Sequence, residues 1–259
     1  MTTPRAAQLE SLLDKGQAAV ARPLGDLWKE IAARERAEDD RLAQVLAGQF
    51  LAGEEITARV CESLAPHVPH GLARDCLALQ AAEERRHAEL YRRYLDTSRN
   101  AGRSDEDAPA LLAPAGDAIM AWRGPPEAVL LAVQVIIEGE ALAFQETARR
   151  FTGCTRFAAL SHTIARDEAR HVAFGRTYLP SALHHLTPRE RSEIYVWLRR
   201  LWFGCMEHLP RVSPLPWFGG PLARHWARRR WSHWEAQLAV FGIGPSATST
   251  VPTLSDPLP

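Results

Sequence analysis

The sequence predicts an all-α protein, a four-helix bundle with additional N- and C-terminal helices. Apolar residues recur at helical spacing through most of the 259 residues, and no segment alternates between apolar and polar residues for long enough to form a strand. A Glu-x-x-His pattern occurs twice, at Glu84–His87 and Glu168–His171, which is typical of paired core helices in a bundle with a metal site. We therefore expect a single domain over residues 1–259.

The first half of the chain divides into helices and loops. We expect a short amphipathic helix at residues 5–20, followed after a proline by one long helical segment at about residues 24–65. A proline-containing turn separates this segment from a second core helix at about residues 71–98. Residues 99–116 are rich in Gly, Asp, Ser and Pro and predict a surface loop.

Two further core helices follow this loop. A short helix near residues 116–122 leads to consecutive prolines, which are suited to opening the third core helix at about residues 126–151. The fourth core helix is expected at about residues 155–179, and Pro180 is expected to end it, because proline lacks the N–H that continues a helix.

The C-terminal part predicts a helical extension at about residues 187–241. Thr187 and Glu190 form a capping-box pattern with a proline between them, so we expect a helix from Thr187 to about Leu209. A last helix is expected at about residues 220–241, and residues 244–259 are expected to be a loose tail.

Composition narrows the classes of function. The formal net charge of zero argues against general binding to nucleic acid or to acidic membranes. The chain has no secretion leader and no apolar run of 18 residues, so we expect a cytoplasmic protein without a membrane span. Its cysteines form no C-x-x-C pair and are expected to be reduced, mostly buried thiols. They are Cys61, Cys76, Cys154 and Cys205.

The two Glu-x-x-His copies belong to a longer internal repeat. Residues three apart on a helix project from the same face, so each copy offers a carboxylate and an imidazole to one metal ion. Aligning Glu83–Leu95 with Asp167–Leu179 also pairs arginines, tyrosines and leucines beyond the motif. We therefore expect two related halves, each of which brings half of a two-metal site.

A two-metal site of this kind needs one more carboxylate from each of two other helices. Glu54 and Glu138 each lie 30 residues before the glutamate of one motif. Glu55 and Glu140 are the alternatives. The apolar face of each helix, drawn at about 100° per residue, favours Glu54 over Glu55 and Glu138 over Glu140.

The expected ligands lie on apolar faces of their helices. Glu84 and His87, for example, share a face with Leu77 and Leu95. Buried unpaired carboxylates are very costly, so four of them directed inward require compensating cations. Two divalent metal ions would provide that charge.

These motifs resemble the ferritin-like di-iron carboxylate superfamily, specifically its oxygen-activating branch. That branch includes the ribonucleotide reductase small subunit, the related ligand-binding oxidases, the hydroxylases of bacterial multicomponent monooxygenases and the arylamine N-oxygenases. The resemblance covers about residues 40–180 and includes an Asp-Glu-x-x-His motif that begins at Asp167. It implies a ferritin-like four-helix bundle.

The resemblance also implies a ligand set and a cofactor. Two Fe ions, with Mn/Fe as the alternative, would be bound by six side chains, with the motif glutamates bridging the ions and the other two glutamates mainly terminal. These side chains are Glu54, Glu84, His87, Glu138, Glu168 and His171.

Three neighbouring residues receive roles by the same resemblance. Asp167 would orient His87, and Glu83 would orient His171, because a carboxylate on the distal ring nitrogen fixes the histidine tautomer. Tyr91 occupies the position of the radical-forming tyrosine of reductase small subunits, so we expect either a redox role or an ordinary packed tyrosine with its hydroxyl bonded.

The resulting functional expectation is an O2-activating dinuclear non-haem iron oxidase or oxygenase. It would act on a small organic substrate and take electrons from an external donor. The alternatives are a ferroxidase or other iron-handling protein, and a radical-bearing subunit that serves a partner. Ile164 stands where arylamine N-oxygenases carry an additional histidine, which argues against N-oxygenation.

The tryptophans and arginines of the C-terminal region allow two interpretations. Two added helices pack their aromatic side chains on the bundle, or a basic helix meets lipid or a partner. We favour the first, with the added helices covering a pocket or forming a homodimer surface.

Overall fold

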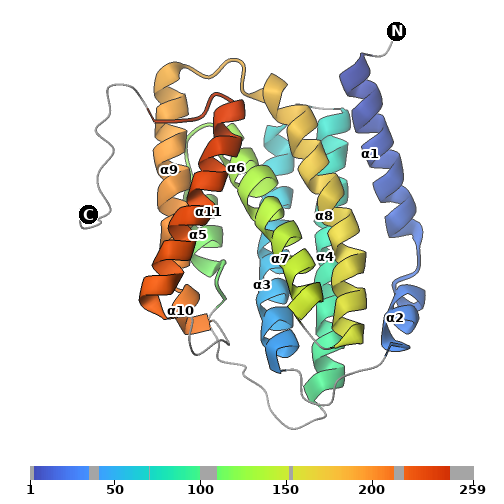
Figure 1. Ribbon diagram of the computed structural model, residues 1–259. Coiled ribbons are helices and arrows are strands. Elements are labelled where there is room, and N and C mark those ends of the chain that lie inside the picture. Colours follow the sequence, from blue (N-terminus) through green and yellow to red (C-terminus); the bar gives the residue numbers. More distant parts are fainter. Residues whose placement is uncertain are drawn as a thin grey trace.

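The computed structural model describes residues 3–34, 41–69, 71–99, 110–151, 154–212 and 219–245. All regular secondary structure in these ranges is helical, which confirms the prediction of an all-α fold. Figure 1 shows long helices side by side in the centre, with shorter helices against them on two opposite sides.

Four long helical rods form the central bundle. The first is α3 (Arg41–Leu64), the second is α4 (Leu72–Arg99) and the fourth is α8 (Thr155–Ala182). The third rod is continuous but composite. It consists of α6 (Pro126–Leu131), the π-helical segment η2 (Ala132–Ile137) and α7 (Glu138–Phe151).

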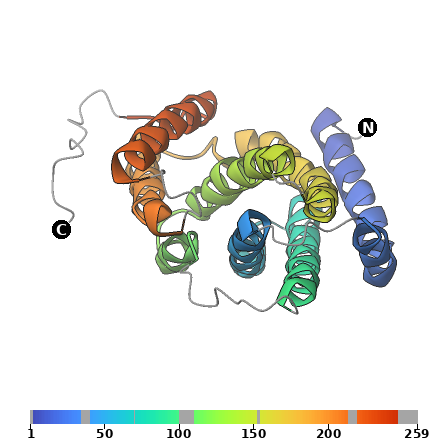
Figure 2. The ribbon, with the colours of Figure 1, turned by 60° about the horizontal axis from the view of Figure 1, so that its bottom comes forward.

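The bundle consists of two antiparallel pairs, α3 with α4 and α7 with α8. The end of α4 and the start of α6 lie at opposite ends of the bundle, so the connection between the pairs crosses its full length (Figures 1 and 2). One long crossover of this kind is the topology of ferritin-like bundles.

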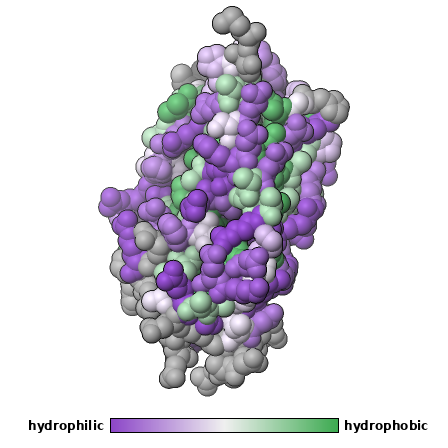
Figure 3. Space-filling model, turned by 90° about the vertical axis from the view of Figure 1, so that its right-hand side faces the viewer, coloured by the Kyte–Doolittle hydropathy of each residue, from purple (hydrophilic) through white to green (hydrophobic). Residues whose placement is uncertain are grey.

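The N-terminal helices cover one side of the bundle. Helix α1 (Pro4–Ala21) begins after Thr3, whose hydroxyl accepts a hydrogen bond from the Ala6 N–H, and packs against α4 and α8. The approach to α4 is close, because a Cβ built on Gly16 would lie 2.5 Å from the Leu79 side chain. Hydrophilic residues cover most of the surface seen from this side (Figure 3).

The expected single segment over residues 24–65 is wrong. Helix α2 (Leu24–Ala32) ends at a turn at Ala33 and Arg34, so the segment is not one continuous helix, and the next described helix is α3. The sequence that follows Ala33 is charged apart from one alanine, so no apolar stripe favours extension of α2 beyond its end.

The C-terminal extension covers the opposite side. It comprises α9 (Pro188–Met206), the short α10 (Leu209–Val212) and α11 (Gly220–Val240), with α5 (Ala113–Ala121) from the crossover packed on α9. The capping box at Thr187 and Glu190 is present. Trp231 and Trp234 are buried while Arg228 and Arg229 are exposed, which confirms that these helices pack their aromatic faces on the bundle.

Three predicted boundaries need correction. The helix expected near residues 116–122 begins earlier, at Ala113, where a proline occupies the first turn. Helix α9 ends at Met206 rather than Leu209. Pro180 does not end α8, because it removes only its own N–H, and the Leu183 N–H still donates to Leu179 O at 2.9 Å.

Some sequence predictions fall outside the described residues. They are the central part of the expected loop (residues 100–109), most of the expected tail (residues 246–259) and Trp217. None of the helices in the described ranges is long and apolar enough to cross a membrane.

All four cysteines are buried and none forms a disulfide, as the sequence predicted. Burial raises the pKa of Cys76 to about 11 and that of Cys205 to about 11, and it raises the pKa of Cys61 well above its usual value. The reactive thiolate is therefore scarce at neutral pH.

We predict that a thiol-specific reagent at pH 8 modifies none of the cysteines of the native protein. The same reagent should modify all four after denaturation, since unfolding exposes the thiols. Counting the thiols that react before and after adding denaturant measures this. Rapid modification of a cysteine in the native protein would contradict the buried positions.

Candidate metal centre

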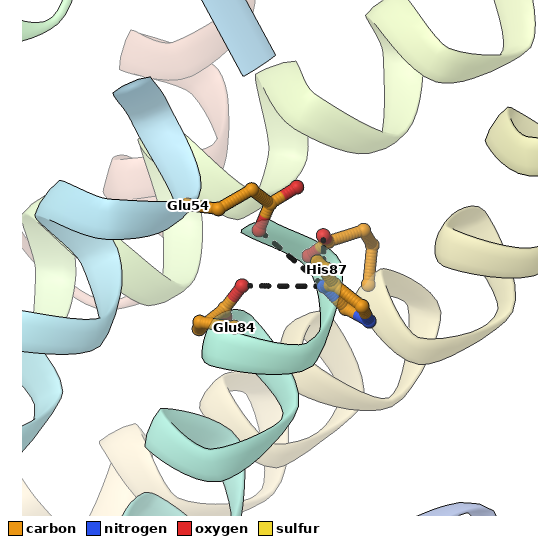
Figure 4. Close-up of side chains that lie close together, drawn as sticks. Glu54, Glu84 and His87 are labelled. Carbon is orange, nitrogen blue, oxygen red and sulfur yellow. Dashed lines mark hydrogen bonds and ion pairs between the residues drawn. The ribbon is translucent and has the colours of Figure 1, made fainter. Parts of the chain in front are cut away.

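Six polar side chains from the four core rods meet in the middle of the bundle. None of them is more than 6% exposed. In Figure 4, Glu54 from α3 points toward Glu84 and His87 from α4. The complete set is Glu54, Glu84, His87, Glu138, Glu168 and His171.

The helices explain why these side chains converge. Each Glu-x-x-His pair stacks within one turn on the inward face of α4 or α8, as its three-residue spacing requires. Glu138 directly follows η2, and π-helical segments of this kind are frequent at functional sites.

The two alternative carboxylates point elsewhere. Glu55 is exposed on α3 and pairs with Arg92. Glu140 turns toward α11 and accepts hydrogen bonds from the Trp234 indole N–H and from Arg230, both at 2.7 Å. The geometry therefore favours Glu54 over Glu55 and Glu138 over Glu140 as members of the cluster.

The cluster contains two groups of possible ligand atoms, and two glutamates belong to both. His87 Nδ1 lies 3.4 Å from Glu84 Oε2 and 3.5 Å from Glu168 Oε1. His171 Nδ1 lies 3.1 Å from Glu84 Oε1 and 3.2 Å from Glu168 Oε2. Each of these carboxylates thus presents one oxygen to each group.

The other two glutamates belong to one group each. Glu54 Oε2 lies 3.3 Å from His87 Nδ1, and Glu138 Oε2 lies 3.5 Å from His171 Nδ1. In each group one oxygen or nitrogen atom from each of four residues lies within 4.8 Å of the others. The cluster is therefore able to bind two metal ions, and Glu84 and Glu168 belong to both groups of possible ligand atoms.

Carboxylates hold the outer nitrogen of both histidines. His87 Nε2 lies 3.1 Å from Asp167 Oδ2, and His171 Nε2 lies 2.9 Å from Glu83 Oε2. An Nε2–H donated to a carboxylate leaves the Nδ1 lone pair directed into the cluster, which is the tautomer that a metal ion requires. Asp167 and Glu83 thus lie where the sequence placed them.

Arg170 connects these two outer carboxylates, a role that the sequence did not predict. Its guanidinium bonds to Glu83 and lies 2.6 Å from Asp167 Oδ1. In the internal repeat Arg170 is matched only with Arg86. The Arg86 guanidinium has different partners, since it donates to the backbone carbonyls of Ala19 in α1 and of Arg22, the residue that follows α1.

Burial raises the pKa of Glu54 and Glu138 well above the ordinary value, and the nearby carboxylate of Glu168 adds to the rise. Burial also opposes ionisation of Glu84, but the imidazole of His171 holds the pKa of this carboxyl well below its usual range.

The two histidines show the opposite response. Burial disfavours their charged forms, but the carboxylates that face them raise the pKa of both well above the ordinary value, chiefly Glu54 for His87 and Glu84 for His171. The cluster therefore stabilises positive charge at its centre, which is the electrostatic requirement for binding cations.

Two buried glutamines next to the cluster were not predicted as site residues. Gln80 donates from Nε2 to Glu138 Oε1 at 2.7 Å and to Glu84 Oε1 at 3.2 Å. Gln134 donates to Gln80 Oε1 at 2.7 Å. Their spacing in the sequence could have indicated this position, since Gln80 and Gln134 each lie four residues before a glutamate of the cluster and therefore on the same face of the helix.

Tyr91 is fully buried beside the cluster. Its ring stacks on Phe50 with 5.5 Å between centroids, and its hydroxyl lies 2.5 Å from Gln145 Nε2. Burial raises the pKa of Tyr91 well above its usual value, with a further contribution from Glu54. The phenol is therefore neutral and bonded, as either of its two expected roles requires.

A cavity of about 430 Å³ reaches the cluster from the side of the extension. Four cluster glutamates line one part of it, and most of the remaining wall is apolar, with the pair Glu140 and Arg230 among the exceptions. Along α3 the lining residues extend from Leu42 to Thr57, which corresponds to roughly 22 Å of helix. Characteristic apolar residues of the wall are Leu46, Phe50, Phe144, Trp202, Met206 and Trp226.

Small residues near the cluster serve two purposes. Ala141 lines the cavity, so it leaves space beside the ligands. Gly175 instead allows close packing, because a Cβ at this position would lie 2.6 Å from Gln134 Cβ. Gly139, next to Glu138, lies directly against the Trp234 ring, which would be 2.4 Å from an added Cβ.

Comparison with solved structures identifies the fold. A variant of an R2-like ligand-binding oxidase with an anaerobically reconstituted Mn/Fe cofactor is similar, with a TM-score of 0.59 and 18% identity over 88% of this chain and 92% of that one. A variant with an aerobically reconstituted Mn/Fe cofactor gives a TM-score of 0.55 and 17% identity over 91% of this chain and 93% of the other.

The chain has the ferritin-like fold of these oxidases. The resemblance inferred from the motifs is thereby confirmed for the fold, and it extends beyond residues 40–180 to most of the chain. No protein-family model and no curated protein matches the sequence.

We predict that Asp167→Asn lowers metal affinity by about 10–100-fold, because the amide supports the His87 tautomer less well than a carboxylate does. Burial opposes ionisation of Asp167, but its partners His87 and Arg170 lower its pKa to about 2, so the wild-type side chain is ionised at neutral pH. Metal titration of the purified variant measures the effect.

Asp117→Asn, at an exposed position of α5, is the control and should bind metal like the wild type. Wild-type metal affinity in Asp167→Asn would show that His87 does not need this partner.

Proposed function

We propose that this protein is a dinuclear metal oxidase or oxygenase that uses O2 to oxidise a small, largely apolar organic molecule. Two Fe ions, or one Mn and one Fe, would be held by six ligands. Glu54 and His87 would complete one position, Glu138 and His171 would complete the other, and Glu84 and Glu168 would be shared by both. Carboxylate and imidazole donors suit these metals.

The charges of the proposed site balance. Four ionised carboxylates match two divalent cations, so binding removes the cost of burying four negative groups together. Two metal ions of this kind, when bound, would donate electrons to O2 and in this way would provide a strong oxidant for the substrate. Glu83, Asp167 and Arg170 would keep the imidazoles in the ligating tautomer throughout.

The observation that carries the proposal is the apolar cavity that ends at the ligands. Its wall would bind a hydrocarbon portion by burial of apolar surface and would exclude water from the site. An apolar molecule in the cavity would have its reacting atoms next to Glu54 and Glu138. Reduction of the metal ions between turnovers would require an external electron donor.

The same cavity argues against the main alternative. A ferroxidase passes hydrated Fe(II) to its site and would need a polar route, whereas the wall along α3, α9 and α11 is largely apolar. The extension also covers one side of the bundle with aromatic residues, an addition that a minimal iron-storage bundle does not need.

We predict that the purified protein binds two metal ions per chain and that His87→Ala and His171→Ala each lose much of this metal. Each variant removes an imidazole from one position and leaves its carboxylates unbalanced. Metal analysis after iron loading measures the stoichiometry. His162→Ala, at an exposed position of α8, is the matched control. Full occupancy in both ligand variants would refute the ligand assignment.

We further predict that the reduced, iron-loaded protein consumes O2 only in proportion to the electrons stored in its two metal ions and then stops without an electron source. An oxidase spends the electrons stored in its own two metal ions and must be reduced again. An oxygen electrode measures this. Continued oxidation of hundreds of Fe(II) ions per chain, in a large hollow assembly, would instead select the iron-storage function.

Tyr91 is the side chain that we propose is oxidised when no substrate is bound, through loss of its phenolic proton and one electron. Its position beside Glu54 supports the proposal. The O2 reaction of Tyr91→Phe should then lack any tyrosyl radical signal in electron paramagnetic resonance that the wild type shows, while metal stoichiometry stays at the wild-type value.

A further inference from the structure

The two metal positions differ in one respect that the internal repeat does not predict. On the His171 side, the carboxylate of Glu138 is held by Gln80. On the His87 side, the corresponding carboxylate of Glu54 bonds to His87 and, among the described residues, has no hydrogen-bond partner outside the cluster. We propose that Gln80 makes the two positions inequivalent, fixing the His171 side and leaving the His87 side adaptable. This inference rests on the proposed function.

The orientation of the Gln80 amide follows from its neighbours. Its two contacts to Glu138 and Glu84 are to carboxylate oxygens, which only accept hydrogen bonds, so the NH2 group must face them. Its oxygen then faces Gln134 Nε2 at 2.7 Å, which is a donor. The reverse orientation would place an amide oxygen against two carboxylates.

Gln80 restrains one oxygen of each carboxylate that it contacts. Glu138 Oε1 accepts from Gln80, so Glu138 Oε2, which lies 3.5 Å from His171 Nδ1, is the oxygen left for a metal ion. Glu84 Oε1 accepts from Gln80 and also faces His171. Both restrained oxygens belong to the His171 side of the cluster.

The surrounding structure holds Gln80 and Gln134 in place. Both amides are buried. Gln134 belongs to η2 and packs against Gly175 of α8, where an added Cβ would lie 2.6 Å from Gln134 Cβ. The contact with Gly175 and the hydrogen bond from Gln134 Nε2 to Gln80 therefore hold Gln134 in place together.

The test uses Co(II), whose visible absorption reports binding, in titrations of the apoprotein. Gln80→Met keeps the length of the side chain but removes the donor. It should weaken one of the two bound ions by about 10–100-fold, the usual effect of removing a residue that orients a ligand, and leave the other within about twofold. Gln145→Met is the matched control, because Gln145 is an equally buried amide that bonds to Tyr91 and to no expected ligand.

Two variants that each keep only one metal position show at which position the ion is weakened. In His87→Ala, where the His171 side remains, adding Gln80→Met should reproduce the loss. In His171→Ala, where the His87 side remains, it should have little effect. Thermal unfolding of each apoprotein verifies folding. If Gln80→Met does not fold, Gln80→Asn replaces it, since the shorter amide cannot reach both carboxylates.

Three results would overturn this role of Gln80. They are wild-type affinity for both ions in Gln80→Met, an equal loss at both positions, and the same loss in Gln145→Met. If the wild-type protein itself bound no Co(II), the proposed metal centre would fail as well. A wild type with two ions and an unaffected Gln80→Met would refute only the inference about Gln80.

Discussion

The structure depends on the burial of four carboxylates at the centre of a helical bundle. A single buried carboxylate without a partner is already costly, and four close together also repel one another. In this fold two imidazoles lie among the four carboxylates, and further charged side chains bond to the outer nitrogens of those imidazoles. Asp167 and Glu83 hold the imidazoles, and Arg170 lies between these two carboxylates. The arrangement is self-consistent only if cations occupy the centre, which is why the cluster itself argues for two metal ions.

The remaining parts of the molecule meet close to this centre. Trp234 of α11 lies directly on Gly139, the residue after Glu138, and its indole N–H donates to Glu140. The extension is thus attached to the same turn of α7 that carries an expected ligand. A side chain in place of Gly139 would push α11 away and change the wall of the cavity. Packing of the extension and the shape of the site are therefore coupled through one glycine.

Much of this could be predicted from the sequence, because the spacing of residues along a helix determines the face on which each side chain lies. Three-residue spacing placed Glu84 with His87, and the apolar face of α3 placed Glu54 rather than Glu55 in the cluster. Features that depend on packing between helices could not be predicted in this way. The π-helical turn before Glu138 has no simple sequence signal, and the contact between Gln80 and Gln134 depends on how η2 is placed relative to α4, which carries Gln80. The end of α2 at Ala32 was missed because charged residues form helices as readily as loops when spacing alone is considered.

The two halves of the repeat supply equivalent ligands, but their surroundings are not equivalent. Gln80 bonds to the Glu138 carboxylate, while no amide side chain of the described residues bonds to Glu54, which lies on the helix that forms the longest wall of the cavity. A carboxylate that is free to change its binding mode is most useful where O2 and substrate must find room, and one that is restrained is most useful where a metal ion must stay in place. The difference between Glu54 and Glu138 therefore gives the centre a fixed side and an adaptable side, and both of these carboxylates line the cavity.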